Sequence, residues 1–296
     1  MVSLQSHLFR QYVKWTANHT DRSGSIEEQR QEFEKVGKMM SMPSGVEVKD
    51  DTVNGLYSEW LIPENTQSNS VILYLHGGGY AIGSVNTHRS MVARIAKASR
   101  TPALIIDYRL APEHPFPAAL HDASGAYQYL LEQGYNNQQI ILMGESAGGG
   151  LVLSTMLCLR DDGIPLPAAA VLMSPFTDLT ASGESVQTRR KQDPMNKPED
   201  IVITQHYVGD CDPAHPMLSP LFADLSGLPP LYIQVGDDEI MLSDSTRLAE
   251  KARKSGVEVE IEIWECMWHV WQFFAPFLPE ANQAIQNIAK FVQSQH

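Results

Sequence analysis

Five short, almost wholly apolar runs are the feature that most constrains the fold of this sequence. They cover residues 71–75, 103–107, 140–144, 168–173 and 231–235. Runs of this length without polar alternation are typical of strands that are buried on both faces. Helix-like stretches lie between and after them, at residues 87–99, 118–134, 147–163 and 243–256. Alternation of this kind predicts an α/β protein with a mainly parallel sheet and helices on both of its faces.

Three further segments complete the predicted sheet. Residues 46–63 alternate apolar and polar side chains around Val53-Asn54-Gly55, which predicts an antiparallel hairpin at one edge. Residues 257–265 predict a last strand, and residues 279–295 a closing helix. Together with the five runs, these segments predict a sheet of eight strands.

Two regions interrupt this pattern. The first 45 residues or so are polar and helix-like, with charges at helical spacing in residues 25–40. Residues 183–216 are polar and rich in proline where a plain crossover is expected. We interpret them as a lid packed on the N-terminal helices, and an irregular surface excursion is the alternative. The predicted organisation is N-terminal cap helices at 1–45, core at 46–182, a cap insertion at 183–216 and core at 217–296.

The charge and the cysteines bear on partners and location. The formal net charge of −13 argues against nucleic acid or an anionic membrane as a partner, because both require a basic surface. The N-terminus lacks the basic and apolar regions of a signal peptide, and no apolar run approaches the ~18 residues of a membrane span. Reduced cysteines in a cytoplasmic chain are expected. These cysteines, which show no spacing of a disulfide framework or a zinc site, are Cys158, Cys211 and Cys266.

The strongest chemical motif is GESAGG at residues 144–149, which follows an apolar run directly and opens a helix-like stretch. A nucleophilic serine protrudes from such a strand-to-helix turn, and its flanking residues must be small for the turn to close. The helix N-terminus also directs free N–H groups and a positive dipole end at the site. We predict that Ser146 is a nucleophile. The alternative is a serine that only caps the helix.

A nucleophilic serine needs a base, and the base needs an orienting acid. In parallel-sheet enzymes with this turn, the acid follows the serine in the chain and the histidine comes last. The segment GDDE after the run 231–235 offers three carboxylates. We predict Asp238, because two residues of loop after the strand let its carboxylate turn over the sheet edge; Asp237 and Glu239 remain alternatives.

His269 is the predicted base because it follows the last predicted strand. His206 and His215 also follow the serine, but both precede the acid and lie in the predicted lid. A lone histidine is more often a buried structural residue, and here its order and placement favour catalysis.

The glycine run HGGG at residues 76–79 ends an early strand. Acyl transfer places negative charge on a carbonyl oxygen, and backbone N–H donors stabilise it, each contributing roughly 3 kcal/mol. Glycines let the main chain approach that oxygen closely. We predict Gly77 and Gly78 as donors together with the N–H of Ala147. His76 is expected to anchor the loop.

A dinucleotide-binding loop is the other interpretation of these glycines. Gly77, Gly79 and Gly83 are spaced one residue too far for that fingerprint, and Ile82 occupies the place of its third glycine. Asp107 does end the next strand, as a ribose-binding acid would. No metal-ligand spacing such as H-E-x-x-H appears, so neither a metal nor a cofactor is expected.

Several motifs together resemble the hormone-sensitive lipase family of α/β-hydrolases. They are HGGG (76–79), DYRLAPEHPFPAA (107–119), GESAGG (144–149), GDDE (236–239) and WH (268–269). The resemblance covers the chain from about residue 46. It implies an α/β-hydrolase fold with an eight-stranded, mostly parallel sheet flanked by helices. It also implies a helical cap built from the N-terminal helices and an insertion after the sixth strand.

The resemblance implies the same site residues in the same roles: Ser146, Asp238 and His269 as the catalytic triad, and Gly77, Gly78 and Ala147 as oxyanion donors. It further implies that the residues around Asp107 and Glu113 hold the loop beneath the site. One position departs from the family, since most members have Asp before the serine and this chain has Glu145. The charge is kept, so activity is expected to persist.

The function predicted on these grounds is a cofactor-independent serine carboxylesterase. It would take a small-molecule ester of short or medium acyl chain through an acyl-enzyme. A lactone hydrolase or a deacetylase of small metabolites is the nearest alternative. A non-catalytic receptor of this fold is another, which the retained His269 argues against. No stable membrane association is expected, and an exposed last strand makes a homodimer possible.

Overall fold

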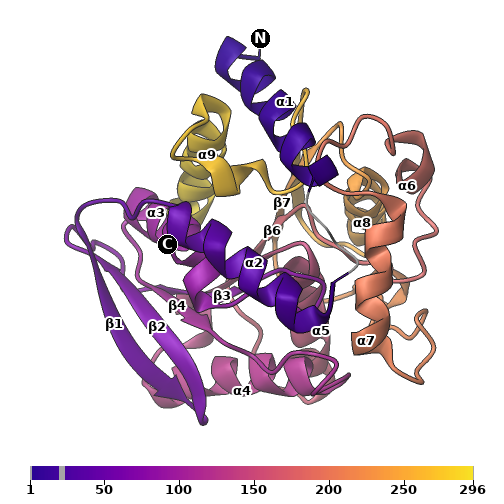
Figure 1. Cartoon of the computed structure of the whole chain (residues 1–296). Helices are drawn as coiled ribbons and strands as arrows, with labels where there is room; N and C mark the ends of the chain where they lie inside the picture. The colour runs from indigo at the N-terminus through magenta and orange to yellow at the C-terminus, as the bar shows by residue number, and fades with distance from the viewer. Residues whose placement is uncertain (1, 20–23, 296) are drawn as a thin grey trace.

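The structure is a computed structural model that describes residues 2–19 and 24–295, and within them it forms one sheet of eight strands (Figure 1). The strands are β1 (Val46–Val53), β2 (Leu56–Pro63), β3 (Val71–Leu75), β4 (Ala103–Ile106), β5 (Ile140–Glu145), β6 (Ala169–Met173), β7 (Leu231–Gly236) and β8 (Val259–Trp264). Their order across the sheet is β1-β2-β4-β3-β5-β6-β7-β8. The five apolar runs and the last predicted strand are therefore confirmed as strands.

The first two strands form the predicted hairpin at one edge of the sheet. β1 pairs antiparallel with β2 in a register that joins Val53 to Leu56. Asn54 and Gly55 make the turn with φ of 52° and 86°, as a two-residue hairpin turn requires. β2 pairs antiparallel with β4, and the remaining neighbours are parallel.

Two apolar cores cover the two faces of the sheet. Along β3, Val71, Leu73 and Leu75 belong to one core, whereas Ile72 and Tyr74 belong to the other. Helices α4, α5 and α8 pack on the first face, and α3 and α9 on the second. The bounds of these helices are α3 (Val85–Ser99), α4 (Ala118–Glu132), α5 (Ala147–Asp161), α8 (Leu242–Lys254) and α9 (Pro279–Ser294). Burial on both faces explains why the strand sequences lack polar alternation.

The N-terminal helices α1 (Leu4–His19) and α2 (Ile26–Met39) lie over the carboxyl ends of the parallel strands, beside the segment 183–216 (Figure 1). That segment contains α6 (Ser185–Thr188), the 3-10 helix η2 (Pro198–Thr204) and α7 (Gln205–Val208). α1 contacts it directly, since the Nζ of Lys197 donates to Asn18 Oδ1 at 3.3 Å. α2 begins in a capping box, in which Ser25 and Glu28 satisfy each other's backbone N–H groups.

The division into core and cap remains a prediction, as does a homodimer through β8, the strand at the other edge. Residues 1 and 20–23 of the predicted cap helices and residue 296 of the predicted core lie outside the described residues. Among the helices that the structure describes, none combines the length and apolar character needed to cross a bilayer.

Candidate active site

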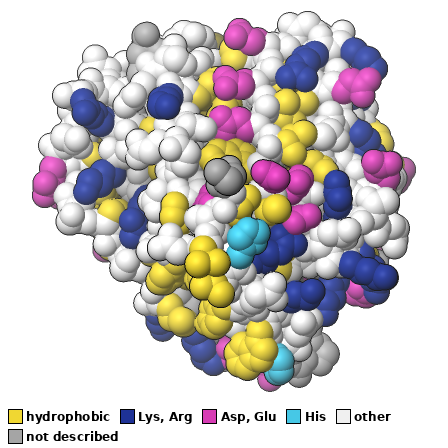
Figure 2. Space-filling model, turned by 90° about the horizontal axis from the view of Figure 1, so that it is seen from above, with side chains coloured by type: hydrophobic (Ala, Val, Ile, Leu, Met, Phe, Trp, Pro, Cys, Tyr) yellow, Lys and Arg dark blue, Asp and Glu magenta, His cyan; other side chains and the backbone are white. Residues whose placement is uncertain are grey.

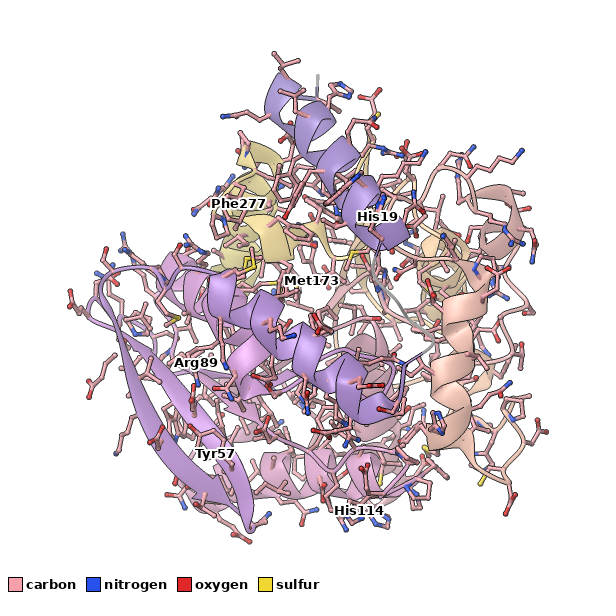
Figure 3. All side chains as sticks on the ribbon, in the orientation of Figure 1. His19, Tyr57, Arg89, His114, Met173 and Phe277 are labelled. Carbon is pink, nitrogen blue, oxygen red and sulfur yellow. The ribbon has the colours of Figure 1, made fainter. Side chains whose placement is uncertain are left out.

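Ser146 lies between the end of β5 and the start of α5, in a backbone conformation with φ of 53° that an L residue rarely adopts. Its N–H donates to the carbonyl of Met173, the last residue of β6, which Figure 3 labels near the middle of the molecule. The turn closes only because glycines flank the serine. A Cβ on Gly144 would meet Gly148 O at 2.5 Å, and one on Gly148 would meet Leu75 O at 2.1 Å. The sequence motif therefore produces the sharp turn expected of it.

The structure brings His269 to Ser146, across 123 positions of sequence. His269 Nε2 lies 2.9 Å from Ser146 Oγ, and its Nδ1 lies 2.8 Å from Glu239 Oε2. With the proton on Nδ1, the ring donates to Glu239 and accepts from the serine hydroxyl. The ring is 7% exposed, so the Glu239–His269–Ser146 chain of hydrogen bonds is largely shielded from solvent.

The prediction of Asp238 as the orienting acid is wrong, because Glu239 is the carboxylate that faces His269. Asp238 instead accepts a hydrogen bond from Arg10 Nη1 at 2.5 Å and is 19% exposed. Glu239 has no exposed surface, and its second oxygen accepts from Ser174 Oγ at 2.8 Å and from Gly236 N at 2.6 Å. These donors fix the carboxylate in one orientation.

Each carboxylate of the GDDE segment thus has a different partner. Asp237 Oδ1 accepts from the N–H of Cys266 at 2.7 Å, which ties the loop after β7 to the loop that carries His269. Asp238 holds Arg10, and Glu239 orients His269. The three residues are consecutive in the chain, yet each carboxylate binds a different part of the protein.

The environment of His269 raises its pKa above the ordinary value. Burial acts in the opposite direction and would lower the pKa, because it penalises the charged ring. The hydrogen bond to Glu239 and the negative charges of Glu239, Asp193 and Glu145 outweigh it. The site therefore stabilises the imidazolium that a general base becomes when it takes a proton.

The glycine loop after β3 lies against this turn, and the structure corrects one of its predicted donors. Gly77 N–H donates to Glu145 Oε1 at 2.7 Å, so it is not free for an oxyanion. The N–H groups of Gly78 and Gly79 donate no hydrogen bond among the described residues. Ala147 is the first residue of α5, where a backbone N–H has no partner within the helix. The available donors are therefore Gly78, Gly79 and Ala147.

Close packing explains why the loop is glycine. A Cβ on Gly77 would lie 2.3 Å from Glu145 Oε2. Gly78 has φ of 114°, and a Cβ there would lie 2.2 Å from Ile82 O. Gly79 has φ of 62° and faces the cap residue Ile203, whose Cγ2 would lie 2.5 Å from its Cβ. The loop therefore depends on missing side chains for its shape.

His76 anchors this loop from below, as predicted. Its Nδ1 lies 2.8 Å from the Gly77 carbonyl, and its own carbonyl accepts from the Tyr108 hydroxyl at 2.7 Å. Burial and then the charge of His88 lower the pKa of His76 to about 3. The neutral ring therefore donates from Nδ1 to Gly77. The predicted structural role of Asp107 also fits, since its carboxylate accepts from Val85 N at the start of α3.

The sequence offered Glu239 only as an alternative to Asp238, and it did not identify Gly79, His88 or Arg10 as members of the site. His88 Nε2 lies 2.8 Å from Glu145 Oε1, and both side chains are almost fully buried. Two features of the sequence could have indicated this pair: Glu145 is a charged residue next to Ser146, and His88 is a polar residue on an otherwise apolar face of helix α3. No three His, Cys, Asp or Glu side chains are grouped as metal ligands in the part of the chain that the structure describes.

Comparison with known proteins agrees with this geometry. Residues 72–273 match a protein family described by its alpha/beta hydrolase fold. The chain is 42% identical to a solved esterase of the bacterial hormone-sensitive lipase family, with a TM-score of 0.95 over 100% of this chain and 99% of that one. The chain belongs to the hormone-sensitive lipase family of α/β-hydrolases. The fold class and the resemblance read from the sequence are thereby confirmed.

Two further proteins are similar over almost the whole chain. An acetyl-hydrolase of Streptomyces hygroscopicus is 39% identical over 99% of this chain and 98% of its own. The solved structure of EstE5, whose crystal was soaked with p-nitrophenyl butyrate, is 42% identical over 99% of each chain, with a TM-score of 0.94.

Proposed function

We propose that this protein is a serine carboxylesterase that hydrolyses small esters of short or medium acyl chain. The observation that carries the proposal is the chain of hydrogen bonds from Glu239 through His269 to Ser146, at 2.8 and 2.9 Å, beside unpaired backbone N–H groups. This arrangement has a nucleophile, a base, an orienting acid and an oxyanion site. It needs no cofactor.

In the first step, Ser146 Oγ attacks the ester carbonyl carbon while its proton passes to His269 Nε2. The carbonyl oxygen takes the electron pair and becomes an oxyanion, which the N–H groups of Gly78, Gly79 and Ala147 stabilise. The imidazolium is held by Glu239. When the tetrahedral intermediate collapses, His269 returns the proton to the departing alkoxide, which leaves as an alcohol.

The acyl-enzyme is then hydrolysed by the same groups. His269 takes a proton from water, and the hydroxyl oxygen attacks the acyl carbon. Collapse breaks the bond to Ser146 Oγ, which recovers its proton from His269. The products are the carboxylic acid and the free enzyme, so atoms and charge balance without a co-reactant.

The names of similar proteins support a small acyl group. One is called an acetyl-hydrolase and another was soaked with a butyrate ester. Ile203 of the cap stands against Gly79 of the oxyanion loop, so bulk at this position limits the space beside the reacting carbonyl. We expect acetate to butyrate esters to be the better substrates, and longer acyl chains to be poorer.

The test is hydrolysis of p-nitrophenyl esters from acetate to octanoate by the wild type and Ser146→Ala, with Ser154→Ala as the control. Ser154 is buried on the same helix and lies outside the site. We expect Ser146→Ala to lose at least 10³-fold in kcat/KM and Ser154→Ala to keep wild-type activity. A fluorophosphonate probe should label Ser146 alone. Equal turnover by wild type and Ser146→Ala would overturn the mechanism, and no turnover of any ester or lactone would favour a receptor.

A further inference from the structure

We propose that Arg10 is a positioning residue, through which helix α1 holds the loops carrying Glu239 and His269 in register. Its guanidinium donates to three separate segments. Nη1 donates to Asp238 Oδ2 at 2.5 Å and to the Cys266 carbonyl at 3.0 Å, and Nη2 donates to the Gln192 carbonyl. Asp238 adjoins Glu239, Cys266 lies three residues before His269, and Gln192 belongs to the cap insertion. This inference rests on the proposed function of the same site.

The planar fork of an arginine suits this arrangement because its donors are fixed in one plane. The side chains of Arg10 and Asp238 are 18% and 19% exposed, so neither is free in solvent. A lysine at this position would supply the charge, but a single ammonium on a flexible stem does not reproduce the fork.

The loop that carries His269, to which Arg10 donates a hydrogen bond at Cys266, is under backbone strain. Cys266 has φ of 57° and Val270 has φ of 49°, and both are conformations that L side chains rarely adopt. Such conformations persist only where the surroundings determine them. Both backbone polar groups of Cys266 are held, because its N–H donates to Asp237 and its carbonyl accepts from Arg10.

Arg10 also compensates charge in the acid loop. Asp237, Asp238 and Glu239 are consecutive, and Glu265 lies close enough to act on Asp237. Burial first, and then the charge of Asp238, raises the pKa of Asp237. Without the guanidinium, like charges would push the loop apart and move Glu239 relative to His269.

The cap insertion also binds the acid loop, at Ile240, the residue after Glu239. Asp193 Oδ2 accepts from the N–H of Ile240 at 3.1 Å, directly after Glu239, while its neighbour Gln192 accepts from Arg10. Figure 2 looks down on this side of the molecule, where Lys and Arg side chains lie among Asp and Glu side chains. The α1 helix and the insertion thus reach the acid loop together, from outside the sheet.

The other end of α1 is attached independently, which supplies a matched control. Glu280, at the start of α9, accepts from Ser3 N at 2.6 Å and from Ser6 Oγ at 2.5 Å. Glu280→Ala therefore loosens α1 without touching either loop of the site.

The experiment compares Arg10→Met, Arg10→Lys, Asp238→Asn, the double variant Arg10→Met/Asp238→Asn and Glu280→Ala. We expect Arg10→Met to lower kcat for p-nitrophenyl butyrate by about 10- to 100-fold, because small misplacements of catalytic groups have effects of this size, with KM within twofold. Arg10→Lys should recover part of the loss. The double variant should be no worse than the poorer single variant, because both substitutions remove the same Arg10–Asp238 contact. Glu280→Ala should keep the wild-type kcat.

A second readout does not depend on turnover. The proton between His269 Nδ1 and Glu239 should give a low-field NMR resonance that is absent in Glu239→Gln. Arg10→Met should shift or broaden it, and Glu280→Ala should leave it unchanged. Wild-type kcat with an unchanged resonance in folded Arg10→Met would overturn the inference, as would fully additive losses in the double variant. If the wild type hydrolyses no ester, the proposed function fails, and the resonance alone decides the role of Arg10.

Discussion

Glu145 and His88 form a buried pair behind the oxyanion loop, with His88 Nε2 2.8 Å from Glu145 Oε1. The same oxygen accepts from the N–H of Gly77 at 2.7 Å. One carboxylate therefore joins the turn that carries Ser146, the glycine loop and helix α3. Gly77 is thereby held against Glu145, whereas the N–H groups of Gly78 and Gly79 donate no hydrogen bond within residues 2–19 and 24–295.

Loss of this carboxylate is expected to reduce catalysis through the position of the loop. Glu145→Ala should lower kcat by about 10- to 100-fold with a small change in KM, less than the 10²–10³-fold that removal of a donor itself causes. It should also lower the free energy of unfolding by about 3–5 kcal/mol, because it breaks a buried pair. Steady-state kinetics and urea unfolding measure the two effects.

Glu59 provides the matched control for that variant. It is equally buried and pairs with Arg89 of α3, which Figure 3 labels. The hydrogen bonds of this pair run to Tyr57 and Asn86 and not to Ser146 or His269. Glu59→Ala should lose comparable stability while kcat stays near that of the wild type. Equal kcat losses in both variants would mean that the Glu145 effect is only a loss of stability.

The pH dependence of hydrolysis should reveal the contact between Glu239 and His269. His269 accepts a proton only when it is neutral, so kcat/KM falls as pH drops through its pKa. Burial lowers that pKa, but the hydrogen bond to Glu239 and the charges of Glu239, Asp193 and Glu145 together raise it by more. The acid limb of the pH profile should therefore lie above the ordinary histidine value of about 6.5. Glu239→Gln removes the charge, so the limb should move to lower pH and kcat should fall by about 10²–10⁴-fold.

Glu265 tests whether general charge near the loop has the same effect. It is exposed on the loop that carries His269, whose ring nitrogens pair with Glu239 and Ser146 instead. Glu265→Gln should leave the acid limb within about 0.3 of a pH unit, the small change expected of an exposed, screened charge. A Glu239→Gln variant that keeps the wild-type limb would contradict the assignment of the acid.

We expect different outcomes for alanine substitution of Gly78, in the oxyanion loop, and of Gly134, after α4, although both have a positive φ. Gly78 has φ of 114° and no room for a Cβ, whereas Gly134 has φ of 96° and nothing within 4 Å of an added Cβ. Both alanine variants should lose about 1–2 kcal/mol from the unfavourable φ. Only Gly78→Ala should also displace Ile82 and the loop, with a loss of kcat of at least 10²-fold. Similar kcat values in both variants would exclude the loop from catalysis.

Local sequence was sufficient to predict the strands and to select Ser146 and His269, whose Oγ and Nε2 atoms lie 2.9 Å apart in the structure. A strand buried on both faces has a continuous apolar sequence, and Ser146 sits in a turn that only small neighbours permit. These properties depend on adjacent residues. The order of the motifs along the chain then left His269 as the histidine that follows the last strand and precedes the closing helix.

The choice among three consecutive carboxylates was beyond sequence reasoning. The side chain that faces His269 depends on how the loop is turned by partners far away in the chain, such as Arg10, which is 228 positions from Asp238. The assignment of Gly77 failed for the same reason. Its N–H is taken by Glu145, 68 positions away, and no local pattern distinguishes the three glycines.

Ionisation of Asp244 should lower the stability of the protein as pH rises from about 4 to 7, an effect opposite in sign to that of His76, whose pKa is lowered to about 3. Burial, partly offset by hydrogen bonds from the N–H groups of Thr177 and Asp178, raises the pKa of Asp244 to about 7. The unfolded chain loses this proton near pH 4, whereas the folded chain keeps it up to about 7. The folded state therefore binds more protons in this window, and the free energy of unfolding falls by at most about 1.4 kcal/mol per pH unit for this group.

Urea unfolding of the wild type, Asp244→Asn and Asp210→Asn between pH 4 and 8 tests this expectation. The amide that Asp244→Asn introduces cannot ionise, so the free energy of unfolding should fall less, or rise more, with pH than in the wild type. Asp107 and Asp193, with pKa values raised by burial to about 6, keep their own contributions in both proteins. Asp210 is exposed, so Asp210→Asn should retain the wild-type slope. An unchanged slope in Asp244→Asn would mean that Asp244 is already ionised in the folded protein at low pH, with Arg247 as its counter-ion.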